Sequence, residues 1–178
     1  VEWDGEKATV TPGQAQRFTE PESFQPVMDT VGETCVAIGY FFYHNETDSK
    51  LGTRVACLTE QGAAKTFVMS AENLYSDNYN FHAIAGLSAN KYVLAKAGDA
   101  TGMNDIIFQL ATITNDTIKV GKELRMMNRT NFGFFDMDNL NDHQIIVTFI
   151  DGNLDNGLES ILLVYNKDRD VLIIGPFL

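Results

Sequence analysis

The sequence predicts an all-β fold, and three observations support this. Short apolar runs rich in Val, Ile, Phe and Tyr recur along the 178 residues, separated by breaks of Asn, Asp and Gly, as in strands joined by tight turns. Twelve Phe and six Tyr stand against one Trp, a usage that favours strands. The best helical candidate, residues 19–29, is interrupted by Pro21 and Pro26.

The last part of the chain, from Asn131 to Leu178, shows the repeating pattern most clearly. Its apolar runs read FGFFDMD, QIIVTFI, LESILLVY and VLIIGPF, at residues 132–138, 144–150, 158–165 and 171–177. Polar, turn-rich breaks separate the runs. We therefore expect a four-stranded antiparallel meander.

The same pattern recurs upstream. First strands begin at Phe24, Phe81 and Phe132, with second strands following as CVAIGYFF, YVLAKA and QIIVTFI. The last hairpin, LLVY-NKDRD-VLIIGPF, has counterparts around Asn115 and Gln61 and at the N-terminus. Sequence identity between the units is low, so their agreement lies in the hydrophobic pattern and in the positions of the turns.

Glycines in the outermost predicted strand also repeat. Gly13, Gly121 and Gly175 fall at equivalent places, and Met69 takes the intervening place. These positions predict one repeating unit of about 45–57 residues.

The repeat predicts β-propeller-type blades, because four-stranded units of this length are typical of propellers. We expect three full units at 24–75, 81–126 and 132–178, preceded by a half unit at 1–18. Blades stack on both faces, which accounts for continuous apolar strands such as ILLVY. Since propellers close with four to eight blades, the chain is expected to belong to a larger propeller or assembly. A β-sandwich without internal symmetry is the alternative.

The composition and charge of the chain limit the kinds of partner that it can bind. The formal net charge is −11, so the chain offers no basic stripe for nucleic acid and no attraction to an anionic membrane surface. No apolar run approaches the ~18 residues that cross a bilayer. The first residue is Val1 rather than Met, which suggests a processed or truncated start.

Two cysteines, Cys35 and Cys57, lie on the second and third strands of the first full unit. A hairpin register that pairs Phe42 with Lys50 also places the two cysteines opposite each other, close enough to bridge. The sequence therefore predicts a disulfide, and with it an oxidising compartment. Two buried free thiols are the alternative.

Three N-x-S/T sequons begin at Asn45, Asn115 and Asn128, all in predicted loops. Chance alone gives roughly 1.7 in this composition, so position is more informative than number. Because glycans need exposed loops, we expect at least one sequon to be occupied and the protein to be extracellular or at the cell surface.

The acidic turn DGNLDNGLE is a candidate calcium site. Asp151, Asn153, Asp155 and Glu159 alternate along it, as the oxygen ligands of calcium do. Asn156 stands where a calcium loop carries Gly. A second cluster of acidic and amide residues precedes this turn, at Asp136, Asp138, Asn139, Asn141 and Asp142. Solvated turns rich in Asn, Asp and Gly are the alternative, and the one we favour.

No catalytic motif is present. His44, His82 and His143 are single and far apart, and we expect structural or surface roles for them. The sequence contains no nucleophile elbow, P-loop or dinucleotide-binding fingerprint. The expectation is a protein that is not an enzyme.

These patterns resemble repeat β-propeller proteins of the secreted or cell-surface type. FG-GAP repeats are the nearest subfamily, through Phe132-Gly133 and the acidic loop DGNLDNG. The resemblance implies the fold and a calcium site; it implies no catalytic residue.

The expected function is a non-enzymatic extracellular glycoprotein module, structural or adhesive, such as a subunit of a surface layer or filament. Its expected partners are copies of itself or other extracellular proteins. One alternative is a lectin-like propeller that binds glycans, although the sole Trp3 offers little aromatic platform. Another is a glycan-active enzyme on the same scaffold.

Overall fold

A computed structural model describes eleven segments of the chain. These segments are residues 2–3, 8–9, 23–45, 48–61, 64–70, 72–75, 81–97, 105–114, 117–126, 135–151 and 157–178. Within them every helix-or-strand element is a β-strand, numbered β1 to β15. The all-β expectation is confirmed.

The strands form three antiparallel meanders and one short hairpin. Sheet I contains β3 (Ser23–Val31), β4 (Cys35–Asn45), β5 (Asp48–Gln61), β6 (Ala64–Met69) and β7 (Asn73–Tyr75). Sheet II contains β8 (Phe81–Ser88), β9 (Lys91–Ala97), β10 (Ile106–Thr114) and β11 (Thr117–Met126). Sheet III contains β12 (Phe135–Asn141), β13 (Gln144–Asp151), β14 (Gly157–Asn166) and β15 (Val171–Phe177). The hairpin pairs β1 (Glu2–Trp3) with β2 (Ala8–Thr9).

The three sheets repeat one another in main-chain detail. In each sheet, the carbonyl of the residue before the second strand accepts a hydrogen bond from the third strand. These bonds are Leu58 N to Thr34 O at 2.7 Å, Ile113 N to Asn90 O at 2.8 Å and Tyr165 N to His143 O at 2.8 Å. The unit is therefore repeated in geometry although its sequence identity is low.

Two glycines of the predicted repeat occupy equivalent places in the outermost strands. A Cβ added at Gly121 would lie 3.1 Å from the carbonyl oxygen of Leu110, and one added at Gly175 would lie 2.9 Å from that of Leu162. The strand register shifts at the same two places. Both glycines thus mark a bulge where the fourth strand crowds the third. Gly13 lies outside the described residues.

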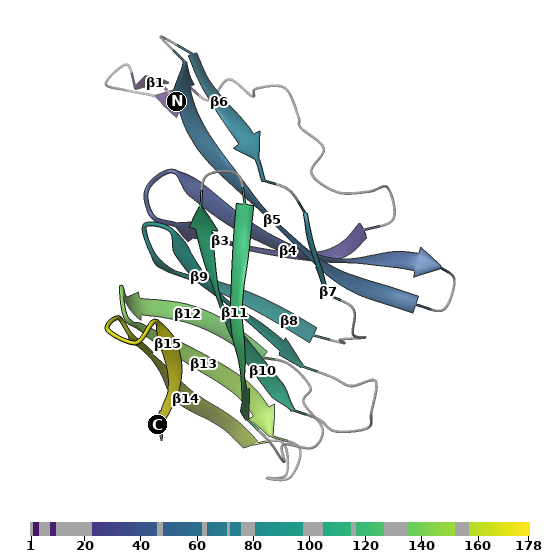
Figure 1. Cartoon of the computed structure of the whole chain (residues 1–178), viewed down its shortest axis with the longest axis vertical. Helices are drawn as coiled ribbons and strands as arrows, with labels where there is room; N and C mark the ends of the chain where they lie inside the picture. Colours follow the sequence, from purple (N-terminus) through teal and green to yellow (C-terminus); the bar gives the residue numbers. More distant parts are fainter. Residues whose placement is uncertain are drawn as a thin grey trace.

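Sheet II lies between the other two sheets (Figure 1). One of its faces packs on sheet III in a core that includes Val93, Phe108, Val147 and Ile161. Its other face packs on sheet I in a second core that includes Leu94. Burial on both faces explains the continuous apolar strands, and the described strands make three stacked layers where a sandwich has two.

The first strands of the three sheets are neighbours in space. β8 contacts β3 of sheet I and β12 of sheet III. Each sheet therefore presents its first strand to the same region, and its fourth strand lies at the opposite edge (Figure 1). We call β3, β8 and β12 the inner strands.

Two strand assignments differ from the sequence prediction. The predicted loop HNETDSKLG is shorter than expected, because β4 continues to Asn45 and β5 begins at Asp48. The paired backbone of the long hairpin overrides the turn-favouring composition of this stretch. Strand β7 was not predicted, and it pairs with β5 over Asn73–Tyr75. Three residues are too few to show a period.

The predicted disulfide is present. Cys35 faces Cys57 in the β4–β5 ladder, in the same register that pairs Phe42 with Lys50. Both cysteines pack against the core between sheets I and II. The disulfide thus joins the second and third strands of sheet I.

Replacing both cysteines, Cys35→Ser and Cys57→Ser, is expected to lower the free energy of unfolding by about 3 kcal/mol. The bridge spans 22 residues, and its loss frees the unfolded chain. Urea unfolding of the double variant and of the oxidised parent measures the difference. A loss below about 1 kcal/mol would show that the bridge adds little to the stability of sheet I.

Candidate functional site

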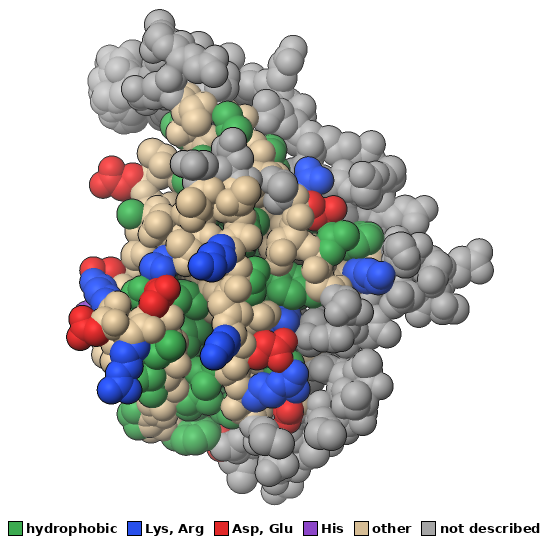
Figure 2. All heavy atoms as spheres, viewed as in Figure 1, with side chains coloured by type: hydrophobic (Ala, Val, Ile, Leu, Met, Phe, Trp, Pro, Cys, Tyr) green, Lys and Arg blue, Asp and Glu red, His purple; other side chains and the backbone are tan. Residues whose placement is uncertain are grey.

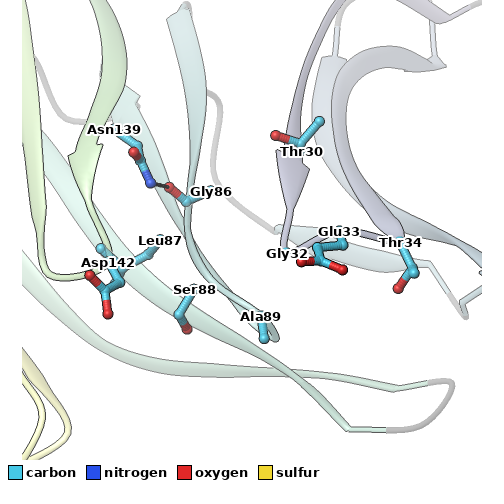
Figure 3. A pocket seen from close by; sticks show the side chains of 10 residues that line it. All are labelled: Thr30, Gly32, Glu33, Thr34, Gly86, Leu87, Ser88, Ala89, Asn139 and Asp142. Atoms are coloured by element: carbon cyan, nitrogen blue, oxygen red, sulfur yellow. Dashed lines mark hydrogen bonds between the residues drawn. The ribbon is translucent and has the colours of Figure 1, made fainter.

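The three inner strands meet at Gly86, which lies in β8. The Gly86 N–H donates a hydrogen bond of 2.7 Å to Asp29 Oδ2 on β3. Asn139 on β12 donates from Nδ2 to the Gly86 carbonyl, at 2.8 Å (Figure 3). One residue of sheet II is thereby bound on both backbone groups by side chains from the two neighbouring sheets.

Only glycine fits at this position. A Cβ built on Gly86 would lie 1.8 Å from the carbonyl oxygen of Thr30, far inside contact distance. Asp29 is itself oriented by the backbone, since its Oδ1 accepts a 2.7 Å hydrogen bond from Thr30 N. The close approach of β3 and β8 therefore depends on the missing side chain and on a carboxylate held in place to receive the Gly86 amide.

A hollow of about 530 Å³ opens beside this contact. It is lined by the ends of the inner strands and the turns that follow them: Thr30, Gly32, Glu33, Thr34, Gly86, Leu87, Ser88, Ala89, Asn139 and Asp142 (Figure 3). Its lining carries hydroxyl, amide and carboxylate groups from all three sheets. Asp142 forms an ion pair with Lys167 at 3.0 Å, and this hydrogen bond lowers the pKa of the Asp142 carboxyl.

A second hollow of about 320 Å³ lies along the inner strands themselves. It is lined by Val27, Met28, Asp29, His82, Ala83, Ile84, Asp136, Met137 and Asp138. Two of its carboxylates accept backbone hydrogen bonds from the following residue, Asp136 from Met137 at 2.9 Å and Asp138 from Asn139 at 2.8 Å. The lining is therefore anionic, with its carboxylates fixed by their own strand.

His82 borders the second hollow from the core side. Its ring meets Phe41 edge to face, with 4.5 Å between centroids, and the side chain is buried. Burial lowers the pKa of His82 to about 4, against a hydrogen bond to the Gly39 backbone that raises it. The imidazole is thus neutral at pH 7, and its role is that of a packed core residue, as the sequence suggested.

The two hollows offer hydrogen-bonding and anionic side chains. Their linings contain no cysteine and no hydrogen-bonded pair of a hydroxyl with a histidine. Among the residues that the structure describes, no group of three or more His, Cys, Asp or Glu side chains is placed to hold a metal ion. The arrangement suits contact with polar or cationic groups.

A buried lysine between sheets I and II was missed by the sequence reading. The Lys96 side chain is 2% exposed, with Nζ 4.5 Å from the Tyr75 ring centroid and 3.5 Å from Glu123 Oε1. Burial raises the pKa of the Tyr75 hydroxyl. The only sequence signal was a lysine inside the apolar run YVLAKA. Lys96 lines neither hollow, so it belongs to the packing between the sheets.

The predicted glycosylation sites are only partly covered by the structure. Asn45 is the last residue of β4 and pairs with Asp48, so it lies at a strand end and not in the middle of a loop. Asn115 and Asn128 lie outside the described residues. Glycosylation therefore stays a prediction.

The structure also describes only some of the predicted calcium ligands. Asp151 ends β13, and Glu159 lies within β14 opposite Phe149, on the strand that the run LESILLVY predicted. Asn153 and Asp155 lie outside the described residues. Calcium binding stays a prediction.

The structure also places the other two histidines and shows two residues of the inner strands that the sequence did not predict. His143 is exposed in the β12–β13 turn, 3.8 Å from Asp142, and His44 lies in β4. Sequence reasoning missed Asp29 and Gly86. The one available signal was an isolated glycine inside the predicted strand FHAIAG, which often marks a close backbone approach.

Comparison with known proteins adds no family: no family model, curated protein or solved structure matches the chain. In the described segments there is no helix long and apolar enough to span a membrane. Function is therefore argued from the geometry of the sheets.

Gly86→Ala is expected to destabilise the fold by about 3 kcal/mol, because the added methyl group forces β3 and β8 apart. Gly121→Ala is the matched control, since its Cβ would meet one backbone oxygen at 3.1 Å on an exposed strand. Chemical unfolding of both variants measures the two costs. Equal costs would contradict the special role of Gly86.

The stability of the fold should fall by about 2 kcal/mol between about pH 7 and pH 5 through His82 alone. Its folded pKa of about 4 lies below the ordinary 6.5, so the unfolded chain takes up a proton that the native state excludes. This stabilisation is complete above pH 6.5 and is lost as the pH falls toward 4.

Urea unfolding at both pH values measures the effect. His82→Gln should flatten the pH dependence. If the pH dependence persists in the His82→Gln variant, groups other than His82 cause it.

Proposed function

We propose that this chain forms consecutive blades of a β-propeller-type extracellular glycoprotein module with a structural or adhesive role. The observation that carries the proposal is the meeting of three inner strands at Gly86. Sheets that stack in chain order, each with its first strand against the next first strand, are arranged as blades around an axis. The module acts by packing and by presenting its turns, not by catalysis.

The disulfide supports an extracellular setting. Cys35 and Cys57 are joined, and bridges of this kind persist in oxidising compartments. The net charge of −11 favours a surface protein that avoids nucleic acid. The three sequons agree with this setting, and N-glycans on the turns are part of the proposal.

The side chains that line the two hollows favour a structural or adhesive role over the binding of sugars. Sugar-binding sites commonly stack a ring on Trp, Tyr or Phe, and neither lining contains one of these residues. The groups that are present accept hydrogen bonds or attract cations.

The experiment is the intact mass of the native protein, measured before and after enzymatic removal of N-glycans and with thiol labelling. We expect a fall in mass on glycan removal and no labelled thiol before reduction. Changing Asn45, Asn115 and Asn128 to Gln should abolish the fall. An unglycosylated chain with two free thiols would overturn the extracellular proposal, and the fold would stand without it.

A further inference from the structure

Sheet III has one face packed on sheet II and one face that nothing covers among the described residues. We define the open face by the apolar side chains that the strand register places on it: Ile146, Ile150, Leu158, Leu162, Val164, Val171 and Ile173. The register pairs Ile146 with Leu162 and Val164 with Ile173, so these side chains share one side of the sheet. The packed side carries Val147, Ile161 and Leu163 instead.

Much of the open face is accessible to solvent. Leu158 is 73% exposed, Ile173 44% and Val171 43%. Figure 2 shows hydrophobic side chains gathered at the lower left, where sheet III lies in Figure 1. The Thr148–Ser160 pair divides the face into two apolar parts, and exposed apolar side chains that gather on one face commonly bind a partner. We propose that the open face docks the same face of a second copy of this chain, as a two-fold dimer.

The polar groups on the open face already have partners within the sheet. Thr148 Oγ1 and Ser160 Oγ lie 3.1 Å apart and share a hydrogen bond. Gln144 Oε1 accepts from Asn141, and Asn166 Oδ1 accepts from the backbone of the β14–β15 turn. Each of these side chains thus already makes one hydrogen bond within the sheet, which lowers the cost of removing it from water.

The charge of the face suits a partner of the same sequence. The chain carries a net charge of −11, so two copies repel each other over most of their surfaces. The residues that β13, β14 and β15 place on the open face include no charged side chain. The carboxylates on this side, Asp136 and Asp138, lie on β12 at the inner edge. Two copies therefore meet here without like charges facing each other.

The packing of the other sheets indicates which face the second copy brings. Both faces of sheet II are covered, by sheets I and III. The outer face of sheet I is buried at its centre, where Ile38 is 6%, Tyr40 1% and Ala56 8% exposed, and it is open at its inner edge, where Met28 is 60% exposed. A head-to-tail contact would need the centre of that face to be free. The open face of sheet III is thus left to pair with itself, as two-fold interfaces do.

The two faces of sheet III carry similar apolar residues. The side packed on sheet II and the open face both present Val, Ile and Leu. Two copies of sheet III face to face would form a layer about 10 Å thick, the spacing of packed sheets. This inference names the surface through which the proposed module would pack on a second copy of itself, and it rests on the structural role in the proposed function alone.

The test is the molar mass of the whole folded chain, by sedimentation velocity from micromolar to submillimolar concentration. We expect a concentration-dependent dimer. The double variant Leu158→Asp with Ile173→Asp should raise the dissociation constant at least ~100-fold, because it places charges on both sides of the two-fold contact. Circular dichroism and the intact disulfide show that the variant is folded.

Met28→Asp is the matched control, since Met28 is also apolar and 60% exposed but lies on sheet I. It should leave the dimer unchanged. A chain that stays monomeric throughout overturns the inference, as does a dimer that survives the double variant or is lost with Met28→Asp. A monomer that is glycosylated and disulfide-bonded would overturn this inference while leaving the extracellular proposal in place.

Discussion

Three strands from three different sheets approach one another at Gly86, and the rest of the architecture depends on how close that approach is. The position excludes a side chain, because a Cβ would lie 1.8 Å from the Thr30 carbonyl oxygen. Its backbone amide and carbonyl bind Asp29 on one side and Asn139 on the other. The polar backbone at the inner edge is thereby satisfied by side chains of the neighbouring sheets, and the sheets diverge from this edge.

Divergence from the inner edge leaves the space between sheets to be filled by apolar side chains. Both faces of sheet II are buried, with Val93 packed toward sheet III and Leu94 packed toward sheet I. Alternate residues of one strand thus serve two different cores. The same arrangement leaves one face of sheet III without a layer among the described strands, and the polar side chains named on it each make a hydrogen bond within the sheet. The proposed dimer therefore follows from the way the chain repeats one unit.

Much of this fold was readable from the sequence, and the reasons are local. Strands such as QIIVTFI and VLIIGPF are recognisable by composition and by the turns between them. The disulfide was predicted because one hairpin register aligns Cys35 with Cys57 and Phe42 with Lys50 at once. Gly121 and Gly175 were identified by their spacing, and their bulges give that spacing a physical cause.

The features that could not be predicted from the sequence depend on contacts between distant segments. Gly86 is an ordinary strand glycine until Thr30, from a different sheet, is placed against it. Lys96 is a surface residue by type, and the Tyr75 ring and the Glu123 carboxylate of other strands help to make its burial tolerable. Strand β7 exists because β5 offers it a free edge. The local signals at these positions, a glycine inside one predicted strand and a lysine inside another, do not identify the distant segments that contact them.

Hydrogen exchange at the Gly86 amide tests the meeting of the inner strands most directly. Because this N–H is bonded to Asp29 Oδ2, it should exchange slowly in the folded protein, and Asp29→Ala should accelerate it while the amides of β9 and β10 keep their protection. A Gly86 amide that exchanges freely in the parent chain, or that is unaffected by Asp29→Ala, would contradict the convergence of the three sheets at this residue.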